Sequence, residues 1–114
     1  MRRLLTALVL LVPSAACAED IVTLATRGGI TQSYLLSAPE KGKARAVAIL
    51  FAGGPGKVDL ERETAGATFD RGNFLVRSRQ LFARNGIVAA VVDAPSDQSQ
   101  GMDDRFRLGG AHAE

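Results

Sequence analysis

The chain has no tryptophan, a single tyrosine, one cysteine and one histidine. A single cysteine cannot form a disulfide within the chain, and this Cys and His content gives no cluster with the spacing of a zinc site. With so few aromatic side chains, we expect one modest hydrophobic core that is stabilised by packing alone. We therefore expect no metal centre and no bound cofactor.

No apolar stretch reaches the ~20 residues that a helix needs to cross a bilayer. The apolar run at residues 4–12 follows Arg2 and Arg3 and precedes Ala-Cys-Ala at residues 16–18. A basic start, a short apolar run and a small-x-small site are typical of a secretory signal peptide. We predict that residues 1–18 are the signal peptide and that the mature chain is exported, periplasmic or secreted, with no membrane partner after cleavage.

Cys17 occupies the place where a lipoprotein would carry its acylated cysteine. Lipoprotein signals favour leucine or a similar residue three places earlier, whereas this chain has Ser14 there. Cleavage after Ala18 would also remove Cys17 from the mature chain. A lipid anchor on Cys17 is therefore the less favoured alternative.

The residues after the predicted signal peptide also lack an excess of one charge. The chain has 14 basic and 12 acidic side chains, and the loss of Arg2 and Arg3 with the leader makes residues 19–114 neutral. Proteins that bind nucleic acids concentrate Lys and Arg on one surface. We therefore expect no nucleic-acid partner.

The sequence after the leader indicates strands and turns. Residues 21–25 and 31–37 are predicted strands around the turn at residues 27–29, which gives a hairpin. The unbroken apolar run at residues 46–51 is typical of a strand that is buried on both faces, and we expect it to be the central strand.

A helix follows that strand. Asn73 is a good N-cap, and Asn85-Gly86 is a typical helix end. Between them, the expected buried face contains Phe74, Leu75, Ser78, Leu81 and Phe82, and the expected exposed face contains Arg77, Arg79 and Arg84. A second apolar run at residues 87–92 predicts another buried strand. The strand, helix and strand form a βαβ unit, which predicts two parallel strands and a right-handed crossover.

The remaining segments are polar. Residues 57–72 predict a long surface excursion, which is either a binding loop or lid or a disordered insert. Asp93 either caps its own turn beside Pro95 or faces a ligand at the carboxyl end of the sheet. Residues 103–107 form a charge-rich patch that we expect to be solvated, and residues 108–114 indicate the start of another helix.

The loop after the first buried strand is the clearest functional candidate. Residues 52–56 read Ala-Gly-Gly-Pro-Gly, and backbone N–H groups in such a loop can be aimed at a developing negative charge. With the helix and second buried strand behind it, this loop resembles the His-Gly-Gly-Pro-Gly segment of the α/β-hydrolase superfamily, with Ala52 at the histidine position. The resemblance covers most of residues 20–114. It implies an α/β fold in which the hairpin and the βαβ unit form an incomplete hydrolase-like sheet.

The resemblance also implies a function. Gly54, with Gly53 beside it, would supply the backbone N–H of an oxyanion hole in a serine esterase or hydrolase that acts on a small-molecule substrate. The family's nucleophile elbow, Gly-x-Ser-x-Gly, does not occur in this sequence, and His112 comes too early to be the catalytic histidine. We therefore expect His112 on a helix surface. Residues 19–114 are then a partial hydrolase-like domain, the N-terminal part of such a protein, with no catalytic side chains and no activity by itself.

A binding protein is the alternative to this interpretation. A small exported α/β module could use the loop at Gly53 and Gly54 to hold an anionic ligand. The two hypotheses differ in whether a serine nucleophile, an acid and a histidine are supplied elsewhere.

Overall fold

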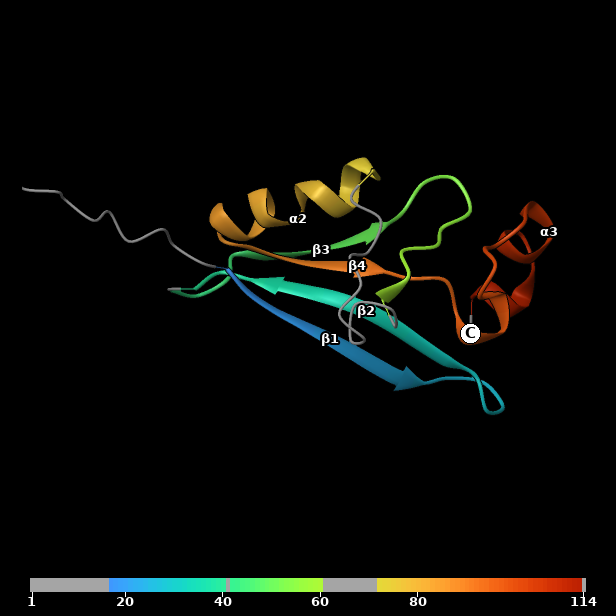
Figure 1. Ribbon diagram of the computed structural model, residues 1–114. Coiled ribbons are helices and arrows are strands. Elements are labelled where there is room, and N and C mark those ends of the chain that lie inside the picture. The colour runs from blue at the N-terminus through green and yellow to red at the C-terminus, as the bar shows by residue number, and fades with distance from the viewer. Residues whose placement is uncertain (1–16, 41, 61–71, 114) are drawn as a thin grey trace, which may run out of the picture.

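The computed structural model describes residues 17–40, 42–60 and 72–113. These residues form a four-stranded sheet with one long helix on one face, and the fold is α/β in character (Figure 1). The elements are β1 (Ala18–Ala25), β2 (Thr31–Ala38), β3 (Ala46–Phe51), α2 (Phe74–Arg84), β4 (Ile87–Val92), the 3₁₀ turn η1 (Ser96–Gln98), α3 (Asp104–Arg107) and the 3₁₀ turn η2 (Gly110–His112).

The sheet is mixed, with the strand order β1-β2-β4-β3. β1 and β2 are antiparallel, β2 and β4 are antiparallel, and β3 and β4 are parallel over their whole length. The predicted hairpin and the predicted parallel βαβ unit are both confirmed. α2 connects the two parallel strands and lies above the sheet in Figure 1.

α2 begins and ends at the residues that the sequence predicted. The Asn73 side chain accepts a hydrogen bond from the backbone N–H of Leu75 at 3.0 Å, which satisfies one of the free donors of the first turn. Gly86 follows the helix with a φ of +76°, a conformation that costs glycine no steric energy.

The predicted buried face of α2 is partly wrong. Arg79 is buried, whereas Phe74 and Leu81 are exposed. The cause is an ion pair to β1, because the Arg79 guanidinium lies 2.9 Å from the carboxylate of Glu19. The sheet-facing side of the helix therefore carries Val76, Ser78, Arg79 and Ala83.

The hydrophobic core lies between α2 and the sheet. The strand register places one apolar row across all four strands, and it consists of Ile21, Leu35, Val91 and Leu50. Val58 and Leu60 are fully buried in the same core, although residues 57–72 were expected to run over the surface. That expectation is wrong for these two residues, because their backbone N–H groups are bound by the Asp93 carboxylate and their side chains join the core; residues 61–71 lie outside the described part of the chain.

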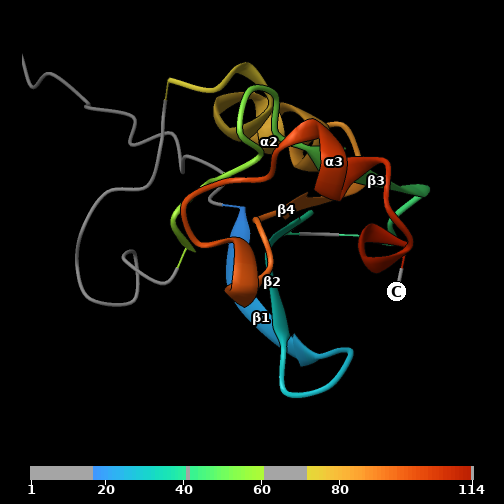
Figure 2. The ribbon, with the colours of Figure 1, turned by 90° about the vertical axis from the view of Figure 1, so that its right-hand side faces the viewer.

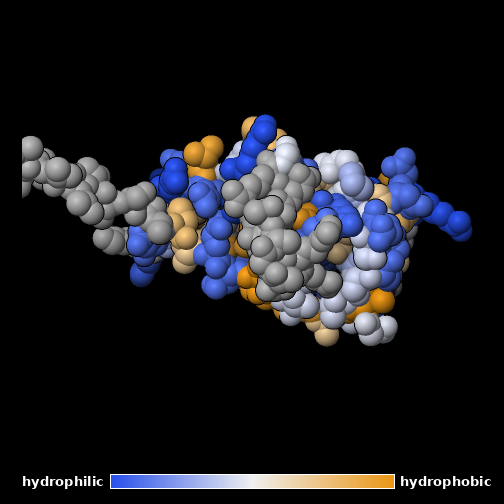
Figure 3. All heavy atoms as spheres, in the orientation of Figure 1, coloured by the Kyte–Doolittle hydropathy of each residue, from blue (hydrophilic) through white to orange (hydrophobic). Residues whose placement is uncertain are grey.

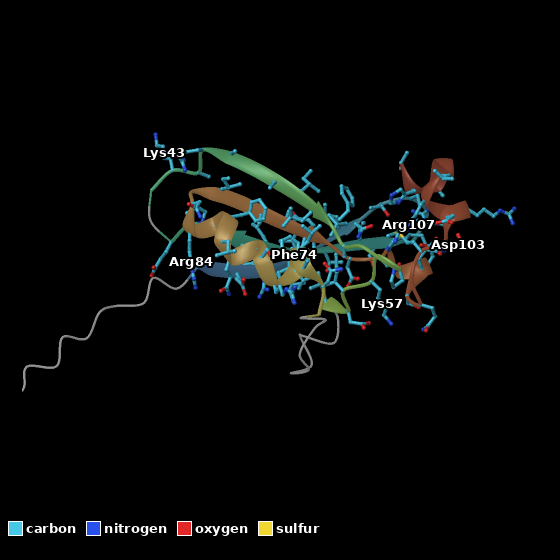
Figure 4. The ribbon with its side chains drawn as sticks, turned by 90° about the horizontal axis from the view of Figure 1, so that it is seen from above. Lys43, Lys57, Phe74, Arg84, Asp103 and Arg107 are labelled. Atoms are coloured by element: carbon cyan, nitrogen blue, oxygen red, sulfur yellow. The ribbon has the colours of Figure 1, made fainter. Side chains whose placement is uncertain are left out.

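β3 is not the central strand that the sequence predicted. Among the residues that the structure describes, it pairs only with β4 and forms the edge of the sheet (Figure 4). Val47, Ile49 and Phe51 are 67%, 62% and 59% exposed, because they point to the face opposite α2. An apolar run predicts a strand, but it cannot show whether a second layer covers both faces.

The C-terminal segment folds at the end of the sheet where β3 and β4 terminate (Figure 2). Its helix begins earlier than expected, at Asp104, because the Asp103 carboxylate accepts a hydrogen bond from the N–H of Phe106 at 2.7 Å. Leu108 ends this single helical turn and Gly109 precedes η2, so the predicted helix over residues 108–114 does not form over residues 108–113.

Candidate functional site

A cavity of about 310 Å³ lies at the carboxyl ends of β3 and β4. Ligands of open α/β sheets gather at this edge, because loops from adjacent parallel strands converge there. The volume lies at the lower end of the range for small-molecule sites. The cavity is bounded by the ends of β3 and β4, the hairpin turn and the segment that carries α3 and η2.

The glycine loop is held against this C-terminal segment. The guanidinium of Arg107 donates a hydrogen bond to the carbonyl of Gly54, and the N–H of Met102 donates to the carbonyl of Pro55 at 2.8 Å. The Met102 methyl carbon lies so close to Gly56 that a Cβ added there would force the Met102 side chain to move. Residues 52–56 and 101–107 therefore pack as one unit.

Gly53 and Gly54 are both exposed at the tip of this loop. Gly54 has a φ of +64°, a region where L side chains are strained, so the turn depends on glycine here. The cavity is lined by Ala52 and Gly56, on either side of the glycine pair. Within the described residues, no acceptor takes the N–H of Gly53 or Gly54.

The Asp93 carboxylate anchors a second loop, and Asp93 also lines the cavity. Its two carboxylate oxygens accept hydrogen bonds from the N–H groups of Val58 at 2.6 Å, Leu60 at 2.8 Å and Ala94 at 2.8 Å. The bond from Ala94 is the predicted cap of its own turn, and the other two join β4 to the start of the excursion after the glycine loop. Three N–H donors leave this buried carboxylate well satisfied.

Two arginines and two aromatic rings meet at the cavity. Arg27, in the hairpin turn, forms an ion pair with Asp97 at 2.5 Å, and its guanidinium carbon lies 5.5 Å from the centre of the Phe106 ring. The Phe106 ring also makes an edge-to-face contact with His112, with 5.6 Å between the ring centres. A cation on an aromatic face and an edge-to-face pair are both favourable arrangements.

Arg107 is fixed differently from Arg27. Its Nη2 donates to the carbonyl of Gly54, and its Nε donates to the carbonyl of Met102 at 3.3 Å. Across residues 17–40, 42–60 and 72–113, no carboxylate forms an ion pair with it. Figure 4 shows Arg107 and Asp103 at the same end of the molecule, far from Lys43 and Arg84.

The sequence did not single out the two arginines of this site. Arg107 was expected in a solvated charged patch, but it turns inward to the glycine loop and the cavity. Arg27 was read only as part of a turn. His112 is exposed, as expected for a surface residue, but it lies on η2 rather than on an α-helix, and it lines the cavity. Long-range contacts between the hairpin, β3 and the C-terminal segment create this site, and no local motif encodes them.

In the described part of the chain, His, Cys, Asp and Glu side chains form no group of three or more that could hold a metal ion. The helices of that part are all too short or too polar to span a membrane. No protein-family model, no curated protein and no solved structure matches the chain.

Proposed function

We propose that the chain is the N-terminal part of an exported α/β-hydrolase-like protein of the serine esterase or hydrolase class, and that it hydrolyses nothing by itself. The observation that carries the proposal is the parallel pairing of β3 with β4, with the glycine loop directly after β3. An antiparallel or separated pair would have removed the basis of the resemblance.

The geometry of the glycine loop supports an oxyanion role for Gly54. Its carbonyl is held by Arg107, which fixes the orientation of the peptide that follows. Its own N–H stays available, and only a backbone donor is required, so Ala52 in place of the family's histidine leaves the donor intact. Loss of one such donor lowers the rate of an acyl-transfer enzyme by about 10² to 10³.

The catalytic side chains of this proposal come from polypeptide other than these 114 residues. The sequence contains no Gly-x-Ser-x-Gly, and His112 contacts Phe106 rather than a serine or a carboxylate. In the complete protein, a serine would attack an ester or similar substrate, a histidine would accept its proton, and the Gly54 N–H would stabilise the tetrahedral oxyanion.

Exposed apolar surface supports the proposal that further polypeptide packs against this chain in the complete protein. Among the described residues, nothing covers the sheet face opposite α2 along β3, and parallel strands are normally covered on both faces. A second apolar hollow, of about 350 Å³, lies along α2 between Phe74 and Ile87. Figure 3 shows hydrophobic residues, in orange, at the surface among the polar ones.

Export and removal of residues 1–18 are part of the same proposal. N-terminal sequencing of the secreted or periplasmic product tests it, and the expected first residue is Glu19. Radioactive palmitate distinguishes the lipoprotein alternative, because only a product that keeps Cys17 takes up the label. A product that begins at Met1 would contradict both.

The decisive experiment for the hydrolase proposal is to sequence the genomic DNA that follows codon 114. We expect a reading frame that encodes Gly-x-Ser-x-Gly, followed by an aspartate and a histidine. The purified chain should hydrolyse 4-nitrophenyl acetate no faster than buffer, and the joined protein should hydrolyse it and lose activity when its elbow serine is replaced by alanine. Unrelated sequence in every frame would overturn the proposal.

The alternative is an anion-binding module built on Gly53 and Gly54. No contact in the described part of the structure supports it. Both glycines lie outside the lining of the cavity, although their N–H groups are free to bind an anion. Unrelated downstream DNA together with cooperative thermal unfolding of the purified chain would favour this alternative.

A further inference from the structure

Two of the three charged side chains that line the cavity at the carboxyl ends of β3 and β4 already have their bonding partners among the described residues. Arg27 is paired with Asp97, and the Asp93 carboxylate is satisfied by three backbone N–H groups. Arg107 is the exception, because its two bonds go to uncharged carbonyls. Within the described residues, Arg107 is therefore the cation of the lining that is left to pair with a carboxylate of a ligand.

The guanidinium of Arg107 is also positioned for such a ligand. It has five N–H donors in one plane, and the bonds to Met102 and Gly54 use Nε and Nη2. Nη1 has no acceptor among the described residues, so its donors remain for a ligand. The two carbonyl bonds hold the plane in place, which lowers the entropy lost when a carboxylate binds.

The remaining walls of the cavity are largely apolar. Phe51 and Val92 line it at the ends of β3 and β4, and Pro95, Met102 and Phe106 line it from the segment after β4. Apolar walls favour a ligand with a hydrophobic body, and a volume of about 310 Å³ accommodates a body of the size of one aromatic ring.

We propose that this cavity binds a small monocarboxylate with an aromatic or branched aliphatic body, with its carboxylate on Arg107 and its body between Phe51 and Phe106. This site is distinct from the glycine pair and does not depend on the hydrolase proposal. Arg27 is a positioning residue here, because it holds Phe106 through its ring contact and is itself held by Asp97.

Phenylacetate and its uncharged counterpart 2-phenylacetamide test the proposal on the purified 114-residue chain. In an NMR titration, phenylacetate should shift the amide signals of residues 51–56, 92–93 and 106–113, and it should bind at least about tenfold more tightly than the amide. Equal affinities would overturn the proposal. So would shifts that map instead to Val47 and Ile49, because binding would then occur on the open sheet face.

Two matched variants test the role of Arg107. Arg107→Gln should lower phenylacetate affinity by about tenfold and leave 2-phenylacetamide binding unchanged. Arg105→Gln, on the same helical turn but outside the cavity lining, should change neither. An equal loss in both variants would mean that only the overall charge matters. If Arg107→Gln does not fold, the affinities of the unaltered chain for phenylacetate and 2-phenylacetamide still test the proposal.

Discussion

The two faces of the sheet carry similar residues in very different surroundings. On the face under α2, Leu35, Leu50 and Val91 are buried beneath the helix. On the opposite face, the same strands carry a row formed by Val22, Tyr34, Val92 and Phe51, which the register places side by side. Residue type alone does not separate the two faces; the layer that lies above each face does.

Neighbouring residues on β3 show the difference most directly. Leu50 is 8% exposed and Ile49 is 62% exposed, although both are aliphatic and adjacent in the sequence. Truncation of a buried leucine removes its hydrophobic contacts and leaves a cavity, whereas truncation of an exposed isoleucine does neither. The two faces should therefore contribute unequally to the stability of this chain.

The largest expected effect comes from this pair. Leu50→Ala should lower the free energy of unfolding by about 2 to 5 kcal/mol, and Ile49→Ala should change it by less than about 0.5 kcal/mol. Urea denaturation of the purified chain, followed by circular dichroism, measures both values. A comparable loss in the two variants would show that the open face is covered in solution, for example by a second copy of the chain.

Asp93 explains how the covered face is closed at the carboxyl end of the sheet. Its carboxylate fixes the N–H groups of Val58 and Leu60, whose side chains are fully buried beside α2. On the open face, no segment of the described chain is held over Val47 and Ile49 in this way. An aspartate at a strand end thus stabilises one face by holding a loop of the chain over the core.

The second prediction tests that closure. Asp93→Asn should lower the free energy of unfolding by about 1 to 3 kcal/mol, because one oxygen is replaced by an NH₂ group that cannot accept from a backbone N–H. Asp97→Asn is the matched control, since Asp97 makes a partly exposed ion pair with Arg27 worth about 0 to 1 kcal/mol. Thermal unfolding of both variants gives the comparison, and a larger loss in Asp97→Asn would refute the closing role of Asp93.

The local elements of the fold were predictable from the sequence. The strands at residues 46–51 and 87–92 have the predicted bounds, and Asn73 caps α2 as expected, because these signals lie within a few residues of one another. The parallel pairing also followed, since a strand, helix and strand in one sheet leave few other arrangements.

The burial of each surface was harder to predict. Arg79 is buried because Glu19, sixty residues earlier, lies opposite it, and no helical periodicity encodes that partner. Val58 and Leu60 are buried because Asp93 binds their backbone. The candidate site was missed for the same reason, because Arg27 and Arg107 reach the cavity through contacts between distant segments.

The third prediction concerns Glu19. Its expected effect on stability is the smallest of the three, because the carboxylate is partly exposed. Burial by itself raises the pKa of this carboxyl, but hydrogen bonds from Arg79 and Ser37, together with the charge of Arg79, outweigh burial and hold the pKa below the ordinary glutamate value. A carboxyl whose pKa is lowered by folding stabilises the folded state only while it is ionised. Its contribution is complete above the unfolded-state pKa, about 4.3, and is lost as the pH falls through the lowered pKa.

Glu19→Gln should therefore reduce stability at pH 7 and flatten the loss of stability on acidification below about pH 4.3. The exposed loop position Glu40 supplies the control, because Glu40→Gln removes the same charge without a partner on α2. Urea midpoints between pH 3 and pH 7 measure the difference. Glu19 joins β1 to the helix that covers the sheet. If the stability of Glu19→Gln changed with pH in the same way as that of the unaltered chain, packing alone would hold α2 on that face.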